Sequence, residues 1–155
     1  MRIALCNEVL GAMAIEDQCE LAAALGYDGL EIAPFTLADS PHRIDAAEAK
    51  RIRGVVESTG LVVTGLHWLL VRPAGLSLTD PDAAVRARTL DVVTRLIGLC
   101  AELGGSVLVH GSPKQRAIAA GETHATRAAS ARTSTSRPRT ASPIASSRSA
   151  APRRR

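Results

Sequence analysis

Short apolar segments alternate with helix-like segments along the first 110 residues, and this alternation constrains the fold more than any other feature of the chain. The spacing predicts strands at residues 2–7, 28–33, 61–68 and 106–110, separated by helices at about 15–25, 45–60 and 80–103. Neighbouring parallel strands need a crossover connection, which is usually a helix. The order therefore predicts an α/β fold built on a parallel sheet.

Local signals mark the ends of the first two expected helices. Gly26 stands where the first helix should end, at the position after the C-cap that glycine favours. Asp45 with Glu48 three residues later is a capping-box-like pair that would satisfy free amide groups at the start of the second helix.

The third expected helix has the strongest periodic pattern. We expect Thr79 or Asp80 to cap it and Pro81 to occupy its first turn, where the missing N–H costs nothing. Apolar residues then recur at three- and four-residue spacing, which predicts a buried stripe. The stripe is formed by Leu90, Val93, Ile97, Cys100 and Leu103.

Periodicity does not decide between an open doubly wound sheet and a closed (β/α)8 barrel. The segment after the first strand reads N-E-V-L-G-A and has no GxGxxG, which argues against a dinucleotide-binding fold.

Charge divides the chain into two unlike parts. Residues 1–116 have a net charge of −3 and residues 117–155 a net charge of +7. Residues 126–155 contain eight Arg, many Ala and Ser, and Ile144 as the only large apolar residue. We expect this basic tail to be disordered, because it cannot bury enough surface to offset its ordering entropy. The mildly acidic remainder argues against nucleic acid as its ligand.

The three cysteines, Cys6, Cys19 and Cys100, are predicted to be buried, reduced thiols, since no CxxC pair or Cys/His cluster in the sequence suggests zinc. No apolar run of about 18 residues is present, so we expect no membrane span. No signal-peptide pattern opens the chain, and a cytoplasmic location is expected.

Each expected strand ends in polar residues. Ligands of parallel α/β folds bind at the carboxyl ends of the strands. Asn7 and Glu8, Glu31, His67 and His110 would share this rim and line a polar pocket. The alternative for each histidine is a buried side chain that hydrogen-bonds a core neighbour.

The loop after the fourth strand adds further binding groups. Ser112 offers a hydroxyl, and Lys114 and Arg116 offer positive charge for a phosphate or carboxylate, although they could equally be surface cations on a solvated loop. Gly111 would let the backbone approach a ligand. Trp68 could stack on a sugar face or fill the core.

Three segments resemble the sugar phosphate isomerase/epimerase family, whose fold is a xylose isomerase-like TIM barrel. They are G-Y-D-G-L-E-I-A-P at 26–34, G-L-H-W-L-L at 65–70 and L-G-G-S-V-L-V-H-G-S-P-K-Q-R at 103–116. The resemblance covers residues 1 to about 125 and implies a partial (β/α)8 barrel of about four βα units.

The resemblance also implies a chemistry. A divalent metal (Mn²⁺, Mg²⁺ or Co²⁺) would polarise a sugar carbonyl while carboxylates move a proton. Glu31, His67 and His110 would line the substrate pocket, and Trp68, Ser112, Lys114 and Arg116 complete the expected substrate-binding set. His67 and His110 are also similar to zinc-binding histidines of the endonuclease IV-like branch.

The sequence departs from this family in its second half. The family places its metal-binding carboxylates mainly on strands five to eight, and no Asp or Glu follows Glu122. A complete barrel needs about 250 residues. We therefore expect an N-terminal half-barrel at 1–125, no metal ligands in this chain, a tail from 126 that is frameshift-derived, and weak or absent activity.

Two other functions remain open from the sequence. The half-barrel could act by assembling with a second half, because its unpaired sheet edges invite homo-oligomers or aggregation. The basic tail could bind nucleic acid non-specifically.

Overall fold

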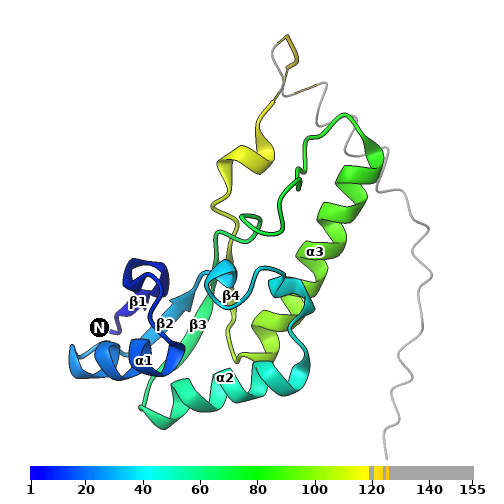
Figure 1. Cartoon of the computed structure of the whole chain (residues 1–155). Coiled ribbons are helices and arrows are strands. Elements are labelled where there is room, and N and C mark those ends of the chain that lie inside the picture. The colour runs from blue at the N-terminus through cyan, green and yellow to red at the C-terminus, as the bar shows by residue number, and fades with distance from the viewer. Residues whose placement is uncertain (119–120, 124, 126–155) are drawn as a thin grey trace, which may run out of the picture.

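A computed structural model describes residues 1–118, 121–123 and 125 of the 155-residue chain. In this part, strands and α-helices alternate along the chain, and short 3-10 helices lie in the connections (Figure 1). The strands are β1 (Ala4–Cys6), β2 (Gly29–Ile32), β3 (Val62–His67) and β4 (Val107–Val109). The α-helices are α1 (Ile15–Ala24), α2 (Ala46–Ser58) and α3 (Ala83–Glu102). The 3-10 helices are η1 (Asn7–Leu10), η2 (Pro34–Thr36), η3 (Pro41–Arg43) and η4 (Pro113–Arg116).

The described strands form one parallel sheet in the order β1-β2-β3-β4. This arrangement confirms the expected parallel α/β fold. Each pair of neighbouring strands is joined by a helix that crosses back over the sheet, as parallel pairing requires. The expected tail at 126–155 lies outside the described residues, so its disorder and the division of the chain at residue 125 stay predictions.

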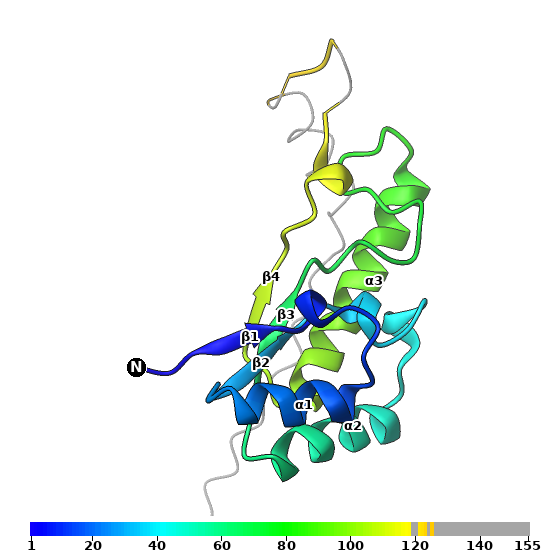
Figure 2. The ribbon, with the colours of Figure 1, turned by 60° about the vertical axis from the view of Figure 1, so that its left-hand side comes forward.

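The three α-helices cover one face of the sheet (Figures 1 and 2). Between them lies the apolar core, in which Leu30, Ile32 and Leu66 of the sheet are fully buried. The helices contribute Cys19, Ala22, Ile52, Val56, Val92, Leu96 and Leu99 to the same cluster. The core therefore fixes the strands from one side and leaves the other side of the sheet free to carry polar residues.

The end signals of α1 and α2 are confirmed. Gly26 has a φ of +82°, and Asp45 is the N-cap of α2, its side chain accepting a hydrogen bond of 2.8 Å from the backbone N–H of Glu48.

The expected cap of α3 was wrong. The helix begins at Ala83, and its N-cap is Asp82, whose side chain accepts a hydrogen bond of 2.8 Å from the backbone N–H of Ala84. Asp80 instead bonds the N–H of Asp82, and the guanidinium of Arg86 donates to the carbonyl oxygen of Asp80 at 2.6 Å. These bonds hold the segment with Pro81 outside the helix.

The expected buried stripe of α3 was wrong in part. Cys100 and Leu103 are buried, but Leu90 is 40% exposed and Ile97 is 50% exposed. The row that packs on the sheet and α2 lies one residue earlier along the helix, at Thr89, Val92, Leu96 and Leu99. The helix carries two adjacent apolar rows, and only contact with the sheet decides which of them is covered.

Within the described residues, none of the helices is both long enough and apolar enough to span a lipid bilayer.

Candidate functional site

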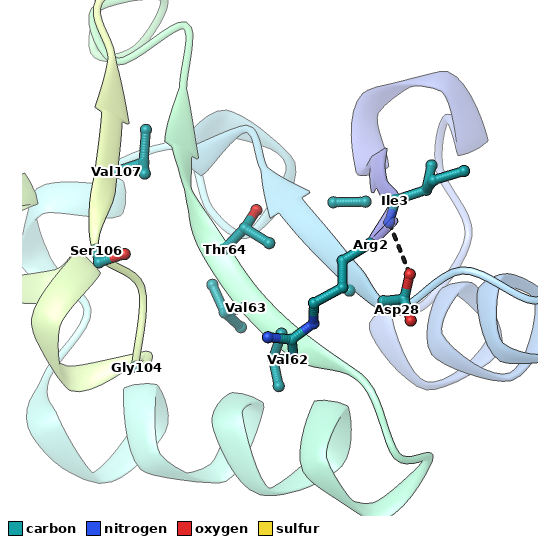
Figure 3. A pocket seen from close by; sticks show the side chains of 11 residues that line it. Arg2, Ile3, Asp28, Val62, Val63, Thr64, Gly104, Ser106 and Val107 are labelled. Atoms are coloured by element: carbon teal, nitrogen blue, oxygen red, sulfur yellow. Dashed lines mark hydrogen bonds between the residues drawn. The ribbon is translucent and has the colours of Figure 1, made fainter.

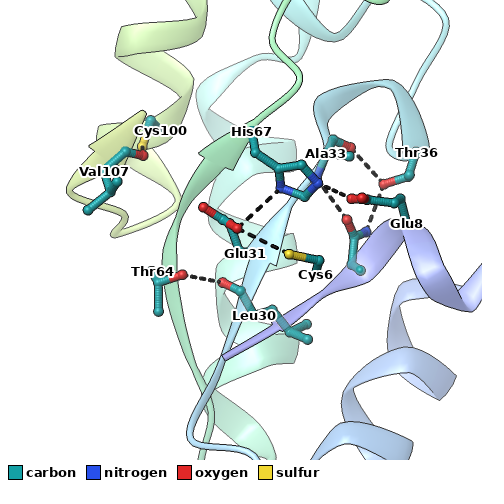
Figure 4. Close-up of polar contacts among 11 residues, drawn as sticks. Cys6, Glu8, Leu30, Glu31, Ala33, Thr36, Thr64, His67, Cys100 and Val107 are labelled. Carbon is teal, nitrogen blue, oxygen red and sulfur yellow. Dashed lines mark hydrogen bonds and ion pairs between the residues drawn. The ribbon is translucent and has the colours of Figure 1, made fainter. Parts of the chain in front are cut away.

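Strand register places Cys6, Glu31 and His67 on the same face of the sheet, opposite the helices. Cys6 is the direct parallel partner of Glu31, and Glu31 is the partner of Gly65. Side chains two residues apart on a strand point to the same face, so His67 faces the same way as Gly65 and therefore as Glu31. All three side chains lie at or next to the carboxyl ends of their strands (Figure 4).

The imidazole of His67 is the centre of this group and is only 6% exposed. Its Nε2 atom bonds the carboxylate of Glu8, which follows β1 in η1. Its Nδ1 atom faces Oε2 of Glu31 at 3.7 Å, and within the described part of the chain this buried nitrogen has no hydrogen-bond partner. The same Glu31 oxygen accepts a hydrogen bond of 3.2 Å from the thiol of Cys6.

The electrostatics of the group are negative. Burial, the hydrogen bond to Glu31 and the charges of Glu31 and Glu8 raise the pKa of the Cys6 thiol to about 11. Each of these effects disfavours a thiolate beside two carboxylates. The group can therefore accept hydrogen bonds from hydroxyls or receive a cation.

Asn7 belongs to the scaffold of this site rather than to its ligand-binding surface. It is fully buried, and its Oδ1 accepts a hydrogen bond of 2.7 Å from the backbone N–H of Ala33. Its amide nitrogen donates to Gln18 at 3.1 Å and to Thr36 at 2.8 Å. These bonds join the ends of β1 and β2 and position Glu8 next to His67.

The residues after β4 form a second, separate part of the rim. His110 is half-buried, and its Nε2 atom has no hydrogen-bond partner in the region that the structure describes. Burial and, to a smaller extent, the charge of Arg116 lower the pKa of His110. The hydroxyl of Ser112 is buried and occupied, because it accepts a bond of 3.1 Å from Leu70 and donates one of 2.9 Å to the carbonyl of His110.

A pocket of about 340 Å³ lies between the loops that follow β3 and β4. Trp68 lines it with 46% of its surface exposed, and its ring lies 6.2 Å from that of Phe35, centroid to centroid. Ser112 and Lys114 also line the pocket, whereas Arg116 is exposed outside the lining. Trp68 is therefore not the core filler of the alternative interpretation.

Another hollow, of about 380 Å³, lies at the amino-terminal ends of the strands (Figure 3). Its lining includes Ile3, whose backbone N–H donates a hydrogen bond of 2.7 Å to Asp28, and apolar residues such as Val62 and Val107. This end of a parallel α/β sheet usually serves stability rather than ligand binding, so we place the candidate site at the carboxyl ends.

The structure brings five of the sequence-predicted residues together in two groups and leaves His110 and Arg116 outside both. Glu31 and His67 lie together in the polar cluster, and Trp68, Ser112 and Lys114 share the pocket. Sequence reasoning missed Cys6, which is half-buried rather than buried, and it did not single out Glu8 as a partner of His67. Cys6 lies near the end of the strand predicted at 2–7 and Glu8 follows it, which was the available signal.

The residues present do not reproduce the metal site that the resemblance implies. Among the described residues, one group of His, Cys, Asp and Glu side chains has its ligand atoms within 4.8 Å of one another, namely Cys6, Glu31 and His67. Carboxylates and water suit Mg²⁺ and Mn²⁺, whereas a thiol does not. This donor set therefore does not fit those cations.

Comparison with known proteins gives the same architecture. The family described as xylose isomerase-like TIM barrel matches residues 19–141. A D-psicose 3-epimerase crystallised in the presence of D-fructose is similar, with a TM-score of 0.63 and 19% identity over 86% of this chain. The 3-keto-D-glucoside 4-epimerase YcjR from E. coli is similar over 70% of this chain, with a TM-score of 0.52 and 20% identity. None of the curated proteins matches.

This chain spans 46% of the length of the first of these epimerases and 36% of the second. At these identities the likeness shows the fold alone. Together with the family match, it confirms the expected partial TIM barrel.

Proposed function

This chain belongs to the xylose isomerase-like TIM barrel family, and from that premise we propose that it carries the first-half substrate surface of a sugar isomerase or epimerase. The observation that carries the proposal is the pocket lined by Trp68, Ser112 and Lys114 at the carboxyl ends of the strands. Its volume of about 340 Å³ suits a small ligand. In this proposal Glu31 and His67, which lie at the same carboxyl-terminal rim but outside the lining of the pocket, add hydrogen-bonding groups for hydroxyls.

Each residue has a distinct role in this proposal. The exposed indole of Trp68 stacks on the apolar C–H face of a sugar ring or chain. Lys114 supplies a cation for a phosphate or carboxylate, which extends the substrate class to sugar phosphates. Glu8 holds the imidazole of His67 through Nε2, so that the ring keeps one orientation toward the ligand.

We propose that the 155-residue chain alone has little or no epimerase turnover. The described residues supply two carboxylates at this rim, Glu8 and Glu31, and both are already engaged with His67 or Cys6. A purified chain that epimerises a ketose in the presence of Mn²⁺, Mg²⁺ or Co²⁺ would contradict this part of the proposal.

Sugar binding can be measured without turnover. Trp68 is the only Trp in the chain, so its fluorescence reports on the pocket directly. We expect a saturable change when a ketose or its phosphate ester is titrated, with tighter binding of the phosphate ester. Lys114→Ala should remove most of the preference for the phosphate.

A matched control is available because the chain has two lysines. Lys50 is exposed on α2 and does not line the pocket, so Lys50→Ala should leave the titration unchanged. No saturable change with any ketose or ketose phosphate would reject the proposal. An equal effect of the two lysine variants would reject the role of Lys114.

Assembly of two half-barrels is a second candidate function, favoured by exposed apolar surface on the edge strand β4. Val107, Leu108 and Val109 of β4 are 38–49% exposed, and β4 pairs on one side only within the described part of the chain. Pairing with β1 of a second copy would cover this surface and continue the parallel sheet. Size-exclusion chromatography with light scattering should then give a dimer, and Leu108→Lys should give a monomer; a monomeric wild-type chain would exclude this assembly.

Non-specific nucleic-acid binding depends on residues 126–155, which lie outside the described residues, and it remains a prediction. Salt-sensitive binding that is lost on deletion of these residues would support it.

A further inference from the structure

The Cys6, Glu31 and His67 cluster has the composition of a transition-metal site. Thiolate and imidazole are ligands that Zn²⁺ prefers, and a carboxylate commonly completes its coordination. The three side chains come from three adjacent strands held in register by the sheet, so their positions are fixed by backbone hydrogen bonds. We propose that these residues bind Zn²⁺ through Cys6 Sγ, Glu31 Oε2 and His67 Nδ1, with a fourth position left open.

The distances between donor atoms fit one cation. Ligands held at the usual distances from a tetrahedral Zn²⁺ lie about 3.3–3.7 Å from one another. Cys6 Sγ lies 3.2 Å from Glu31 Oε2, and this same oxygen lies 3.7 Å from His67 Nδ1. One ligand atom from each of the three residues lies within 4.8 Å of the other two, so a single cation between them is within reach of all three side chains.

The buried imidazole provides an independent observation. The side chain of His67 is 94% buried, yet its Nδ1 atom has no hydrogen-bond partner among the described residues and is aimed at Glu31. A buried polar atom without a partner is unfavourable, and a bound water or ion is one of the explanations for such an atom in a native protein. A cation between Nδ1 and the carboxylate satisfies both groups.

Glu8 gives His67 the second contact that metal-binding histidines usually have. Such histidines donate their other ring N–H to a carboxylate or carbonyl, which fixes the tautomer. The bond between His67 Nε2 and Glu8 places the proton on Nε2 and leaves the lone pair of Nδ1 facing Cys6 and Glu31. Glu8 is thus a positioning residue for the metal site.

Binding of Zn²⁺ forms a bond between Sγ and the metal and releases the thiol proton of Cys6 to solvent. The thiolate and the carboxylate of Glu31 then balance the charge of the cation. This site lies on β1–β3 and is distinct from the carboxylate site on later strands that the resemblance implies. It shares His67 with the histidine pair that is similar to endonuclease IV-like zinc ligands, but Cys6 and Glu31 take the place of His110. It does not depend on the proposed sugar chemistry.

The test is a titration of the purified full-length chain with Co²⁺ and Zn²⁺ under reducing conditions. We expect one equivalent of Co²⁺ to give a tetrahedral visible spectrum and a thiolate-to-cobalt charge-transfer band, both displaced by Zn²⁺. Cys6→Ser should remove the charge-transfer band and weaken Zn²⁺ binding by at least about 100-fold, because loss of even an outer partner of a ligand weakens metal binding by about 10–100-fold. Glu8→Gln should weaken Zn²⁺ binding by about 10–100-fold and keep the thiolate-to-cobalt charge-transfer band.

Cys100→Ser is the matched control, since it also removes one thiol and Cys100 lies outside the cluster. It should bind Co²⁺ as the wild type does. Alkylation of each cysteine, followed by mass spectrometry, gives a second readout that needs no variant: Zn²⁺ should slow the modification of Cys6 and leave Cys19 and Cys100 unchanged.

The proposal is overturned if the wild-type chain gives no thiolate band and Zn²⁺ does not protect Cys6. It is also overturned if Cys6→Ser and wild type bind Co²⁺ with the same affinity and spectrum. Sugar binding measured through Trp68 in metal-free buffer is a separate result, so failure of the metal site and failure of the sugar pocket can be told apart.

Discussion

Gly111 lies directly against the ring of Trp68, so that a Cβ atom added at Gly111 would lie 2.6 Å from Cδ1 of the indole. Both residues also adopt left-handed backbone conformations, with φ of +50° at Gly111 and +52° at Trp68. A glycine after β4 therefore serves close packing of the two loops that form the pocket. The sequence predicted that Gly111 would let the backbone come close to a ligand. In the structure the group that comes close to Gly111 is the indole of Trp68.

Gly111→Ala should displace Trp68 and destabilise the fold by about 1–3 kcal/mol, because it adds a clash to an unfavourable φ. The measurement is urea unfolding followed by Trp68 fluorescence, with a change in the folded-state emission maximum as the sign of displacement. Gly11→Ala is the control, since Gly11 has a φ of +64° and open space around an added Cβ. Equal effects at the two glycines would show that the contact with Trp68 is unimportant.

Leu96→Ala should destabilise the protein by about 2–5 kcal/mol, because Leu96 is fully buried between α3 and the sheet. The neighbouring Ile97 is 50% exposed, and Ile97→Ala should change the free energy of unfolding by less than about 1 kcal/mol. Denaturant unfolding of both variants checks this difference. If the loss of unfolding free energy in Ile97→Ala grew with protein concentration, it would instead indicate that α3 contributes to an interface between chains.

Asp45→Ala should destabilise the protein by about 0.5–2 kcal/mol, since it removes the side chain that accepts the N–H of Glu48 at the start of α2. Asp91→Ala is a suitable comparison, because Asp91 forms an exposed ion pair with Arg95 that contributes about 0.3–0.5 kcal/mol. The two variants are to be compared by thermal and urea unfolding. An equal loss of unfolding free energy in Asp45→Ala and Asp91→Ala would contradict a capping role for Asp45.

Stability should fall as pH falls below about 6.5, in part because of His42. Burial lowers the pKa of His42, and the charges of Arg43 and Arg95 act in the same direction against a smaller opposite effect of Asp91. Between the folded-state and unfolded-state pKa values of His42, the folded protein thus binds fewer protons than the unfolded protein. The stability that His42 contributes is therefore complete above its unfolded-state pKa and is lost as the pH falls through its folded-state pKa. Urea unfolding between about pH 7.5 and 5.5 should show a smaller pH dependence for His42→Gln than for wild type; identical slopes would exclude His42 as a source.

The order of the strands and helices could be predicted from the sequence because it depends on local periodicity. Alternating apolar residues in short segments and a 3.6-residue repeat in longer ones are properties of each segment alone. The end signals at Gly26 and Asp45 are equally local, and both were confirmed. The prediction of the α3 N-cap was wrong because Thr79, Asp80 and Asp82 are all chemically suited to cap a helix. Which of them caps α3 depends on the contacts of Arg86 with the preceding backbone.

The sequence by itself determined that polar side chains end each strand of a parallel α/β sheet. Only the tertiary structure decided which of them meet: the register of three strands that are distant in sequence places Cys6 beside Glu31 and directs His67 toward both, while His110 and Lys114 lie elsewhere on the rim. The physical reason is that register and packing are set by hydrogen bonds and core contacts between segments, and these interactions leave no periodic signal within a single segment.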